Sequence, residues 1–112
     1  MTADKLLSLL GLCRRANKLS LGHDACIQAI TRRTAKLCII CSDASERLKK
    51  EFERETGFDN RNITLITLPY TQQDIKKAAG KPARVLTVND EGFAQAILRL
   101  AENQTGGNNA IC

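Results

Sequence analysis

Residues 37–41, with the sequence LCIIC, place the strongest constraint on the fold. They are five apolar residues in a row without polar alternation, a pattern typical of a short strand that is covered on both of its faces. Such a strand needs further strands at its sides and helices above and below it. The chain has 112 residues, which is enough for one hydrophobic core, so a single domain is expected.

Helical and strand-like patterns alternate along the chain, which indicates an α/β fold. We predict a three-layer α/β/α sandwich with a central mixed, mostly parallel four-stranded sheet. Residues 1–103 are expected to form the domain, and the Gly- and Asn-rich residues 104–112 a disordered tail. The spacing of apolar residues predicts helices at 3–15, 23–34, 45–56, 71–80 and 90–103, and strands at 18–21, 36–42, 62–68 and 84–88.

Two of the predicted helices carry recognisable start signals. Asp43 and Ser45 are capping candidates for the helix at 45–56. Thr71 and Asp74 have the spacing of a capping box, and Gly80 is a typical helix stop. These signals support the boundaries of both helices.

Cys38 and Cys41 form a CxxC pair that has three possible meanings: a redox pair, half of a zinc site, or no chemistry. Zinc needs four ligands, and residues three apart in a strand face opposite sides of the sheet. A thioredoxin-like pair sits at a helix N-terminus, whereas this pair lies inside an apolar run. We therefore interpret the two cysteines as small buried hydrophobes of a central strand.

His23 is the single histidine of the chain, and Cys26 follows it at helical spacing. A Cys-His nucleophile pair is therefore one hypothesis, and a small thiol or hydrolytic enzyme would use Cys26 or Cys38. Cys26 belongs to an apolar stripe, which favours burial, and His23 suits a surface or capping role. The common phosphate-binding, zinc-protease and serine-hydrolase motifs do not occur in the sequence. We expect no enzymatic activity, no cofactor and no metal.

The chain carries a net charge of +5, which favours a polyanionic partner. Residues 1–42 hold seven basic and two acidic residues, whereas residues 43–75 hold five basic and seven acidic ones. No apolar run approaches the roughly 20 residues of a membrane span. Asp4 and the short, broken apolar run near the start argue against a signal peptide. A cytoplasmic protein with reduced thiols is expected, and no membrane partner.

Two basic features are candidates for binding that polyanion. A turn at Gly22 should leave backbone N–H groups of the following helix unpaired, which makes an anion site if basic residues lie nearby. The loop GKPAR, residues 80–84, places two cations around a rigid proline. We expect the Gly22 turn and this loop to meet at one end of the sheet.

Two long segments resemble a known family. LGHDACIQAITRRTAKLCIICSDAS, residues 21–45, and LPYTQQDIKKAAGKPARVLTVNDEGFAQAIL, residues 68–98, are similar to the kink-turn RNA-binding ribosomal protein superfamily of the archaeal L7Ae-like proteins. The resemblance extends over residues 5–102 and is greatest to the bacterial YlxQ-type branch. It implies the same α/β/α sandwich and a non-enzymatic RNA-binding function, with structured, kink-turn-like or ribosomal RNA as partner.

The family reads kinked RNA with a Gly-x-Asn-Glu-x-x-Lys motif at the start of its second helix. Gly22 matches the glycine, but Asp24, Ala25 and Gln28 replace the asparagine, glutamate and lysine. Arg32 falls on a basic position four residues beyond the motif. Losing these polar groups removes contacts to base edges and phosphates, so the resemblance implies weakened or altered kink-turn recognition.

The resemblance and the basic features together define a predicted RNA-binding site. Further candidate partners are the ribosome and transcription or translation factors, and a monomer is expected. The alternative function is a protein-interaction adaptor of the translation or transcription machinery that has lost RNA readout. The predicted site consists of Lys18, Gly22, His23, Asp24, Gln28, Arg32, Lys36, Lys81, Pro82, Ala83 and Arg84.

Overall fold

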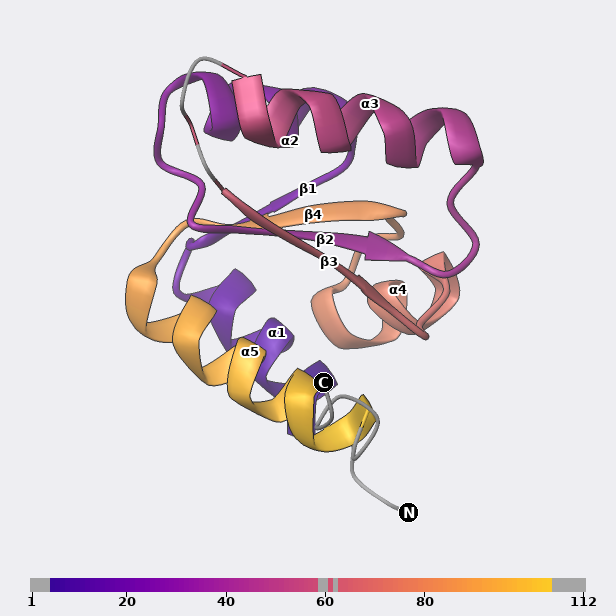
Figure 1. The fold of residues 1–112 in the computed structure, drawn as a ribbon. Helices are drawn as coiled ribbons and strands as arrows, with labels where there is room; N and C mark the ends of the chain where they lie inside the picture. The colour runs from indigo at the N-terminus through magenta and orange to yellow at the C-terminus, as the bar shows by residue number, and fades with distance from the viewer. Residues whose placement is uncertain (1–4, 59–60, 62, 106–112) are drawn as a thin grey trace.

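The computed structural model describes residues 5–58, 61 and 63–105 (Figure 1). The predicted helix residues 3–4, strand residue 62 and tail residues 106–112 lie outside the described residues. The elements in chain order are α1 (Lys5–Arg15), β1 (Leu19–Leu21), α2 (His23–Thr31), β2 (Leu37–Cys41), α3 (Glu46–Gly57), β3 (Thr64–Leu68), α4 (Gln72–Ala79), β4 (Val85–Val88) and α5 (Glu91–Thr105).

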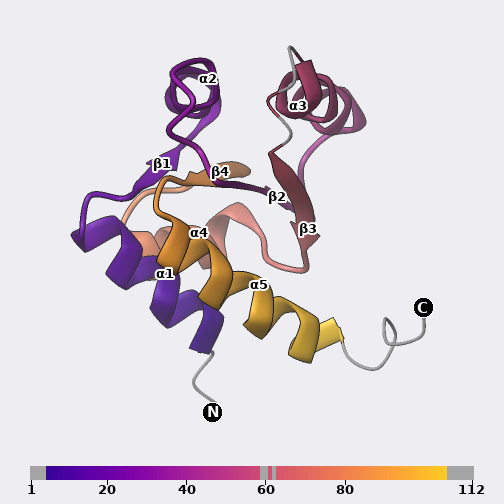
Figure 2. The same ribbon diagram turned by 60° about the vertical axis from the view of Figure 1, so that its left-hand side comes forward.

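The helices cover the sheet on both sides. α2 and α3 lie on one face, and α1, α4 and α5 lie on the other (Figures 1 and 2). The predicted three-layer α/β/α sandwich around a four-stranded mixed sheet is therefore confirmed. Within the described residues, no helix is long and apolar enough to cross a membrane.

The strand directions correct one detail of the prediction. The strand order is β1-β4-β2-β3, and only β2 and β3 pair in parallel, because β4 is antiparallel to both of its neighbours. The expectation of a mostly parallel sheet was wrong. α4 is only about 12 Å long at 1.5 Å per residue, which is shorter than a five-residue strand. It therefore does not return the chain to the end of the sheet at which β2 and β3 begin. The chain consequently enters β4 from the end at which β2 and β3 finish.

β2 is the central apolar strand that the sequence predicts, and all five of its residues are buried. Cys38 and Ile40 belong to the core under α2 and α3, whereas Ile39 and Cys41 belong to the core against α1, α4 and α5. The CxxC cysteines therefore face opposite sides of the sheet, as predicted.

The predicted helix signals are also present. Ser45 accepts a hydrogen bond from the Leu48 N–H at 3.1 Å. Thr71 and Asp74 form the capping box of α4, and Gly80 ends that helix with a positive φ of 86°. α2 ends earlier than predicted, at Thr31, and α5 runs on to Thr105.

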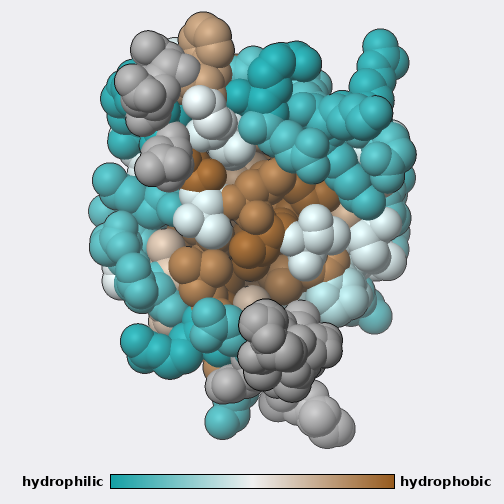
Figure 3. Space-filling view, in the orientation of Figure 1, coloured by the Kyte–Doolittle hydropathy of each residue, from teal (hydrophilic) through white to brown (hydrophobic). Residues whose placement is uncertain are grey.

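β3 is an edge strand whose outer side is open. Its Leu65 and Ile66 are only partly buried, each packed against one of the two cores. Figure 3, drawn in the orientation of Figure 1, shows apolar side chains gathering at the centre of the face where β3 runs. The basic features of the predicted site lie at the two ends of the sheet rather than on this edge.

Candidate functional site

The strand directions divide the predicted site between two ends of the sheet. At one end β1, β2 and β3 finish and β4 begins, and we call this the Gly22 end. At the other end β1, β2 and β3 begin and β4 finishes, and we call this the Lys36 end. Each predicted residue belongs to one of these ends or lies along α2 between them.

Gly22 connects β1 to α2 at the first of these ends. Its φ of 93° and ψ of 166° lie in a region that is essentially reserved for glycine. Its N–H donates to the Val85 carbonyl oxygen at 3.0 Å, and its carbonyl accepts from the Cys26 N–H at 3.0 Å. Because the Gly22 cap of α2 carries no side chain and no cap hydrogen bond from the described side chains is present, the N–H groups of its first turn are available to an anion.

The 80–84 loop reaches the same end of the sheet, as the sequence predicts. Lys81, Pro82 and Arg84 are exposed, whereas Ala83 is buried. The Arg84 carbonyl accepts from the Cys41 N–H at 2.9 Å, which fixes the end of the loop beside the end of β2. The loop therefore stands next to the α2 entrance, with two exposed cations.

His23, the first residue of α2, is held by acidic partners. Its Nε2 lies 2.7 Å from a Glu51 carboxylate oxygen on α3, and its Nδ1 lies 3.1 Å from an Asp24 oxygen. Its ring also packs edge-on against Phe52, at 5.6 Å between centroids. The hydrogen bond with Glu51, followed by the one with Asp24, raises the pKa of His23. The side chain is therefore positioned by α3.

The Gly22 end holds two acidic side chains, Asp43 and Glu51, that the sequence reasoning missed as site residues, in addition to the predicted Asp24. Asp24 is fully exposed, and Asp43 pairs with Arg84 at 3.5 Å between Oδ2 and Nε. Asp43 was expected to cap α3, but its carboxylate instead accepts from the Gln72 N–H at the start of α4. Asp43 and Glu51 lie far from Gly22 in sequence, so no local signal would have placed them here.

Lys18, Arg32 and Lys36 lie at the opposite end of the sheet. The Lys18 carbonyl accepts from Asn89, and the Lys36 N–H donates to Val88, each at 2.8 Å. Arg32 is the C-cap of α2. These residues therefore do not join the anion site at the start of α2, and Gln28 lies exposed along the helix between the two ends.

A polar pocket of about 230 Å³ also lies at the Lys36 end. Basic side chains of Arg33, Lys36 and Arg61 line it together with Glu91. The Arg61 guanidinium already forms an ion pair with Glu55, whose carboxylate oxygen lies 3.1 Å from Nη1. The basic residues of the predicted site thus fall into two separate regions rather than one.

The thiols do not form the hypothetical nucleophile pair. The Cys26 Sγ donates to the carbonyl oxygens of Ser20 and Val85, at 3.5 and 3.6 Å, and His23 turns toward Glu51. Burial raises the pKa of Cys26 to about 12 and also raises that of Cys38. Both groups are therefore thiols, not thiolates, at neutral pH.

Comparison with known proteins connects this arrangement to a family. The family model of the ribosomal protein L7Ae/L30e/S12e/Gadd45 family matches residues 4–98. The chain is 32% identical to the RNA-binding protein YlxQ of Enterococcus faecium over 98 residues, covering 88% of this chain and 92% of that protein. It is 30% identical to the RNA-binding protein YlxQ of Bacillus subtilis strain 168, covering 91% and 100% respectively.

Solved structures show the same fold. A protein of unknown function from Bacillus halodurans C is 32% identical and superimposes with a TM-score of 0.79, covering 88% of this chain and 98% of that one. The 15.5kD RNA binding protein of Giardia lamblia shares the fold with a TM-score of 0.64 at 13% identity, covering 90% and 88%. With sequence and fold in agreement over nearly its whole length, the chain belongs to the ribosomal protein L7Ae/L30e/S12e/Gadd45 family, where it is similar to the YlxQ proteins.

Proposed function

We propose that this protein is a non-enzymatic RNA-binding protein whose interface lies at the Gly22 end of the sheet. The names of the YlxQ relatives support RNA as the partner. The observation that supports this location of the interface is the 3.0 Å hydrogen bond from the Gly22 N–H to the Val85 carbonyl. This bond sets the open N-terminus of α2 directly beside the 80–84 loop.

The proposed interface combines three kinds of contact with RNA. The N–H groups and dipole of α2 favour a phosphate at the helix entrance. Lys81 and Arg84 supply exposed cations for neighbouring phosphates, and Pro82 presents a rigid apolar surface between them. Gly22 has no side chain, so an RNA backbone can approach α2 closely. Structured RNA, ribosomal or kink-turn-like, offers phosphates and unstacked bases for these contacts.

The same surface favours weak or altered kink-turn specificity. Asp24 is fully exposed where a family asparagine would read a base edge, and it repels phosphate. Gln28 is exposed but carries no charge. Each good polar base contact is worth about 1–3 kcal/mol, so loss of two such contacts should weaken binding by about 30-fold to about 10⁴-fold. Backbone and shape recognition should consequently dominate.

Filter-binding titrations with a kink-turn RNA and a ribosomal RNA fragment, at several salt concentrations, test the interface. The double variant Lys81→Gln/Arg84→Gln should weaken binding at least about tenfold and reduce the salt slope by about one per lost phosphate contact. The matched control is Arg32→Gln/Lys36→Gln, which removes the same charge at the opposite end. Equal losses in both variants, or no binding of either RNA at low salt, would contradict the proposal.

Restoring the family motif tests the specificity claim separately. Asp24→Asn, Ala25→Glu and Gln28→Lys together should raise affinity for a kink-turn RNA at least about tenfold over a straight duplex. These three positions are exposed on α2, so the fold should tolerate the changes. An unchanged preference between the two RNAs would show that the substitutions do not set specificity.

A protein-interaction adaptor remains the second candidate because of the acidic residues at the Gly22 end. Asp24, Asp43 and Glu51 all lie there, and they oppose a polyanion. An adaptor should retain its protein partners after nuclease treatment, and Asp24→Lys should release them. Partners that disappear with nuclease would instead support RNA as the primary ligand.

A further inference from the structure

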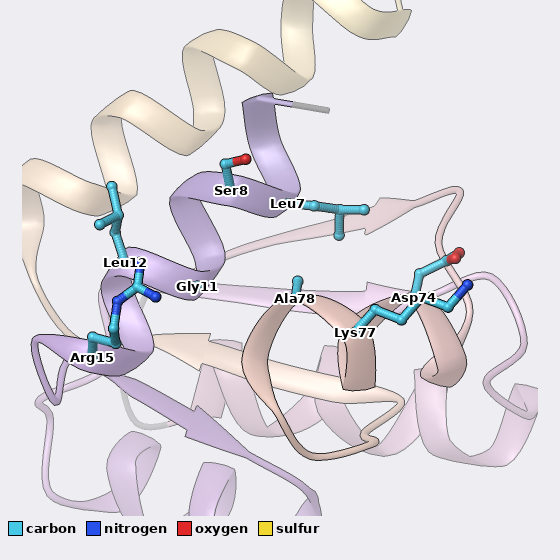
Figure 4. A pocket seen from close by; sticks show the side chains of 8 residues that line it. All are labelled: Leu7, Ser8, Gly11, Leu12, Arg15, Asp74, Lys77 and Ala78. Atoms are coloured by element: carbon cyan, nitrogen blue, oxygen red, sulfur yellow. The ribbon is translucent and has the colours of Figure 1, made fainter. Parts of the chain in front are cut away.

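α1 and α4 belong to the helix layer across the sheet from α2 (Figure 2). A groove lies between these two helices (Figure 4). It has a volume of about 560 Å³. At its floor the two helices approach closely, since a Cβ atom on Gly11 would lie 2.8 Å from the Ala78 carbonyl oxygen. The walls of the groove are formed by side chains of α1 and α4 on either side of this close crossing.

Leu12 gives the groove an exposed apolar wall. The core-facing stripe of α1 consists of Leu6, Leu10 and Cys13, which are completely buried. Leu12 lies outside that stripe and is 50% exposed, and within the described part of the chain only Phe58 is a comparably exposed large apolar residue. Leu7 adds a second, partly buried apolar side chain to the same groove.

Arg15 and Lys77 add two positively charged side chains to the lining of the groove. Neither has an ion-pair partner in the described part of the chain. The acidic residue that lines the groove is Asp74, and its carboxylate already accepts the Thr71 N–H at 2.9 Å and the Thr71 hydroxyl at 3.3 Å. The groove therefore presents leucines beside two cations and one carboxylate, so that its charged lining is net positive.

We propose that this groove docks an acidic amphipathic helix of a partner protein. Leucine-type side chains on one face of that helix would cover Leu7 and Leu12, and its glutamates or aspartates would pair with Arg15 and Lys77. The distance along α1 from Leu7 to Arg15 is about 12 Å at 1.5 Å per residue, which accommodates about two turns of a docked helix. The proposal goes beyond RNA binding, because it assigns a protein partner to a different surface.

The chemistry of the groove favours this occupant over three others. An RNA would leave the exposed leucines uncovered, and the groove offers no aromatic ring on which a base could stack. Residues 106–112 of the chain itself contain no acidic side chain to match the two cations. A second copy would have to present an acidic helix, yet the exposed helix α3 carries basic residues interspersed with its acidic ones.

A randomised library of helical peptides displayed on phage and selected on the full chain provides the test. The enriched peptides should combine Asp or Glu with apolar residues at helical spacing. Leu12→Gln, and separately Arg15→Glu/Lys77→Glu, should weaken their binding at least tenfold. The matched control is Lys50→Glu/Arg99→Glu, which changes the net charge equally at exposed residues outside the groove and should change binding less than twofold.

Further readouts separate the possible outcomes. On titration of ¹⁵N-labelled protein with an enriched peptide, amide shifts should concentrate at residues 7–15 and 74–78. Basic or patternless peptides, or peptides that bind both groove variants like wild type, would overturn the proposal. It would also be overturned if Arg15→Glu/Lys77→Glu abolished RNA binding, or if Leu12→Gln converted a dimer to a monomer in sedimentation. Loss of RNA binding in Lys81→Gln/Arg84→Gln with peptide binding intact would show that the two surfaces act independently.

Discussion

The Nε2 atom of His23 lies 2.7 Å from the Glu51 Oε2 atom, and this contact joins the first residue of α2 to α3. The Phe52 ring, completely buried beneath, packs edge-on against the same imidazole. The contact therefore couples the two helices of one layer at the Gly22 end of the sheet. Its strength should depend on the protonation of His23.

Stability should fall as the pH rises through the pKa of His23. The hydrogen bonds to Glu51 and then Asp24 raise that pKa above its ordinary value of 6.5. A raised folded pKa means that the protonated ring stabilises the fold, fully so below the unfolded pKa, and that this contribution is lost above the folded pKa. Guanidinium unfolding at a series of pH values measures the effect, which solvent screening keeps small because the ring is 47% exposed.

Glu51→Gln is the control for the origin of this pH dependence. It removes the charged acceptor, so the pKa of His23 should move back toward 6.5 and the loss of stability with pH should shrink. Because His23 is the single histidine, its ring proton resonance reports the pKa in an NMR titration without ambiguity. Identical titration curves for wild type and variant would show that Glu51 does not control this group.

Gly22→Ala should destabilise the protein by about 1–3 kcal/mol, because a φ of 93° with a ψ of 166° strains any residue with a side chain. A Cβ atom at this position would meet nothing within 4 Å, so the cost is that of the backbone alone. Gly57→Ala is the matched control, since it also has free space but no positive φ. It should be neutral or stabilising by up to about 1 kcal/mol. Equal effects on the free energy of unfolding would contradict the backbone explanation.

Gly11→Ala should destabilise for a different reason. Its Cβ would lie 2.8 Å from the Ala78 carbonyl oxygen, so α1 and α4 must move apart. Overpacking of this kind costs about 1–3 kcal/mol, which outweighs the gain of about 1 kcal/mol in helix propensity. Ser8→Ala, at an exposed position of the same helix, isolates the propensity term and should not destabilise. Chemical denaturation of both variants gives the comparison, and a stabilised Gly11→Ala variant would refute the close helix crossing.

Cys13, Cys26, Cys38 and Cys41 should resist alkylation in the native protein. Burial raises the pKa of Cys13 to about 11 and those of Cys26 and Cys41 to about 12, and thiolate is the reactive form. Brief iodoacetamide treatment followed by peptide mass spectrometry should show these four residues unmodified, and modified after unfolding in guanidinium. Rapid native labelling of Cys26 or Cys38 would revive the hypothesis of a thiol enzyme.

Local features of the sequence predicted the elements well. The apolar run at 37–41 is a strand buried on both faces, and the caps at Ser45 and Thr71 and the stop at Gly80 are all present. Such signals depend on interactions between residues close together in the chain, so a sequence contains them directly. The α2 end was misplaced by three residues, because Arg33 adopts a positive φ of 62° that no glycine or proline announces.

The candidate site could be predicted only in part. Gly22 and the 80–84 loop meet as expected, but Lys18, Arg32 and Lys36 lie at the other end of the sheet. α2 separates Arg32 and Lys36 from Gly22, since its nine residues extend about 14 Å at 1.5 Å per residue, whereas β1 separates Lys18 from Gly22. Asp43 and Glu51 belong to the site through contacts between segments that are distant in sequence. The groove that Leu12 and Arg15 line with α4 depends on such contacts as well.

The sequence by itself determined the alternation of helices and strands, the buried central strand and the family to which the chain belongs. Only the tertiary structure decided that β4 runs antiparallel to its neighbours and that Gly22 is paired with Val85. It also decided that His23 is held by Glu51. The physical reason is that periodicity and capping are local, whereas strand order and side-chain partners depend on how far each connection carries the chain before it can pack.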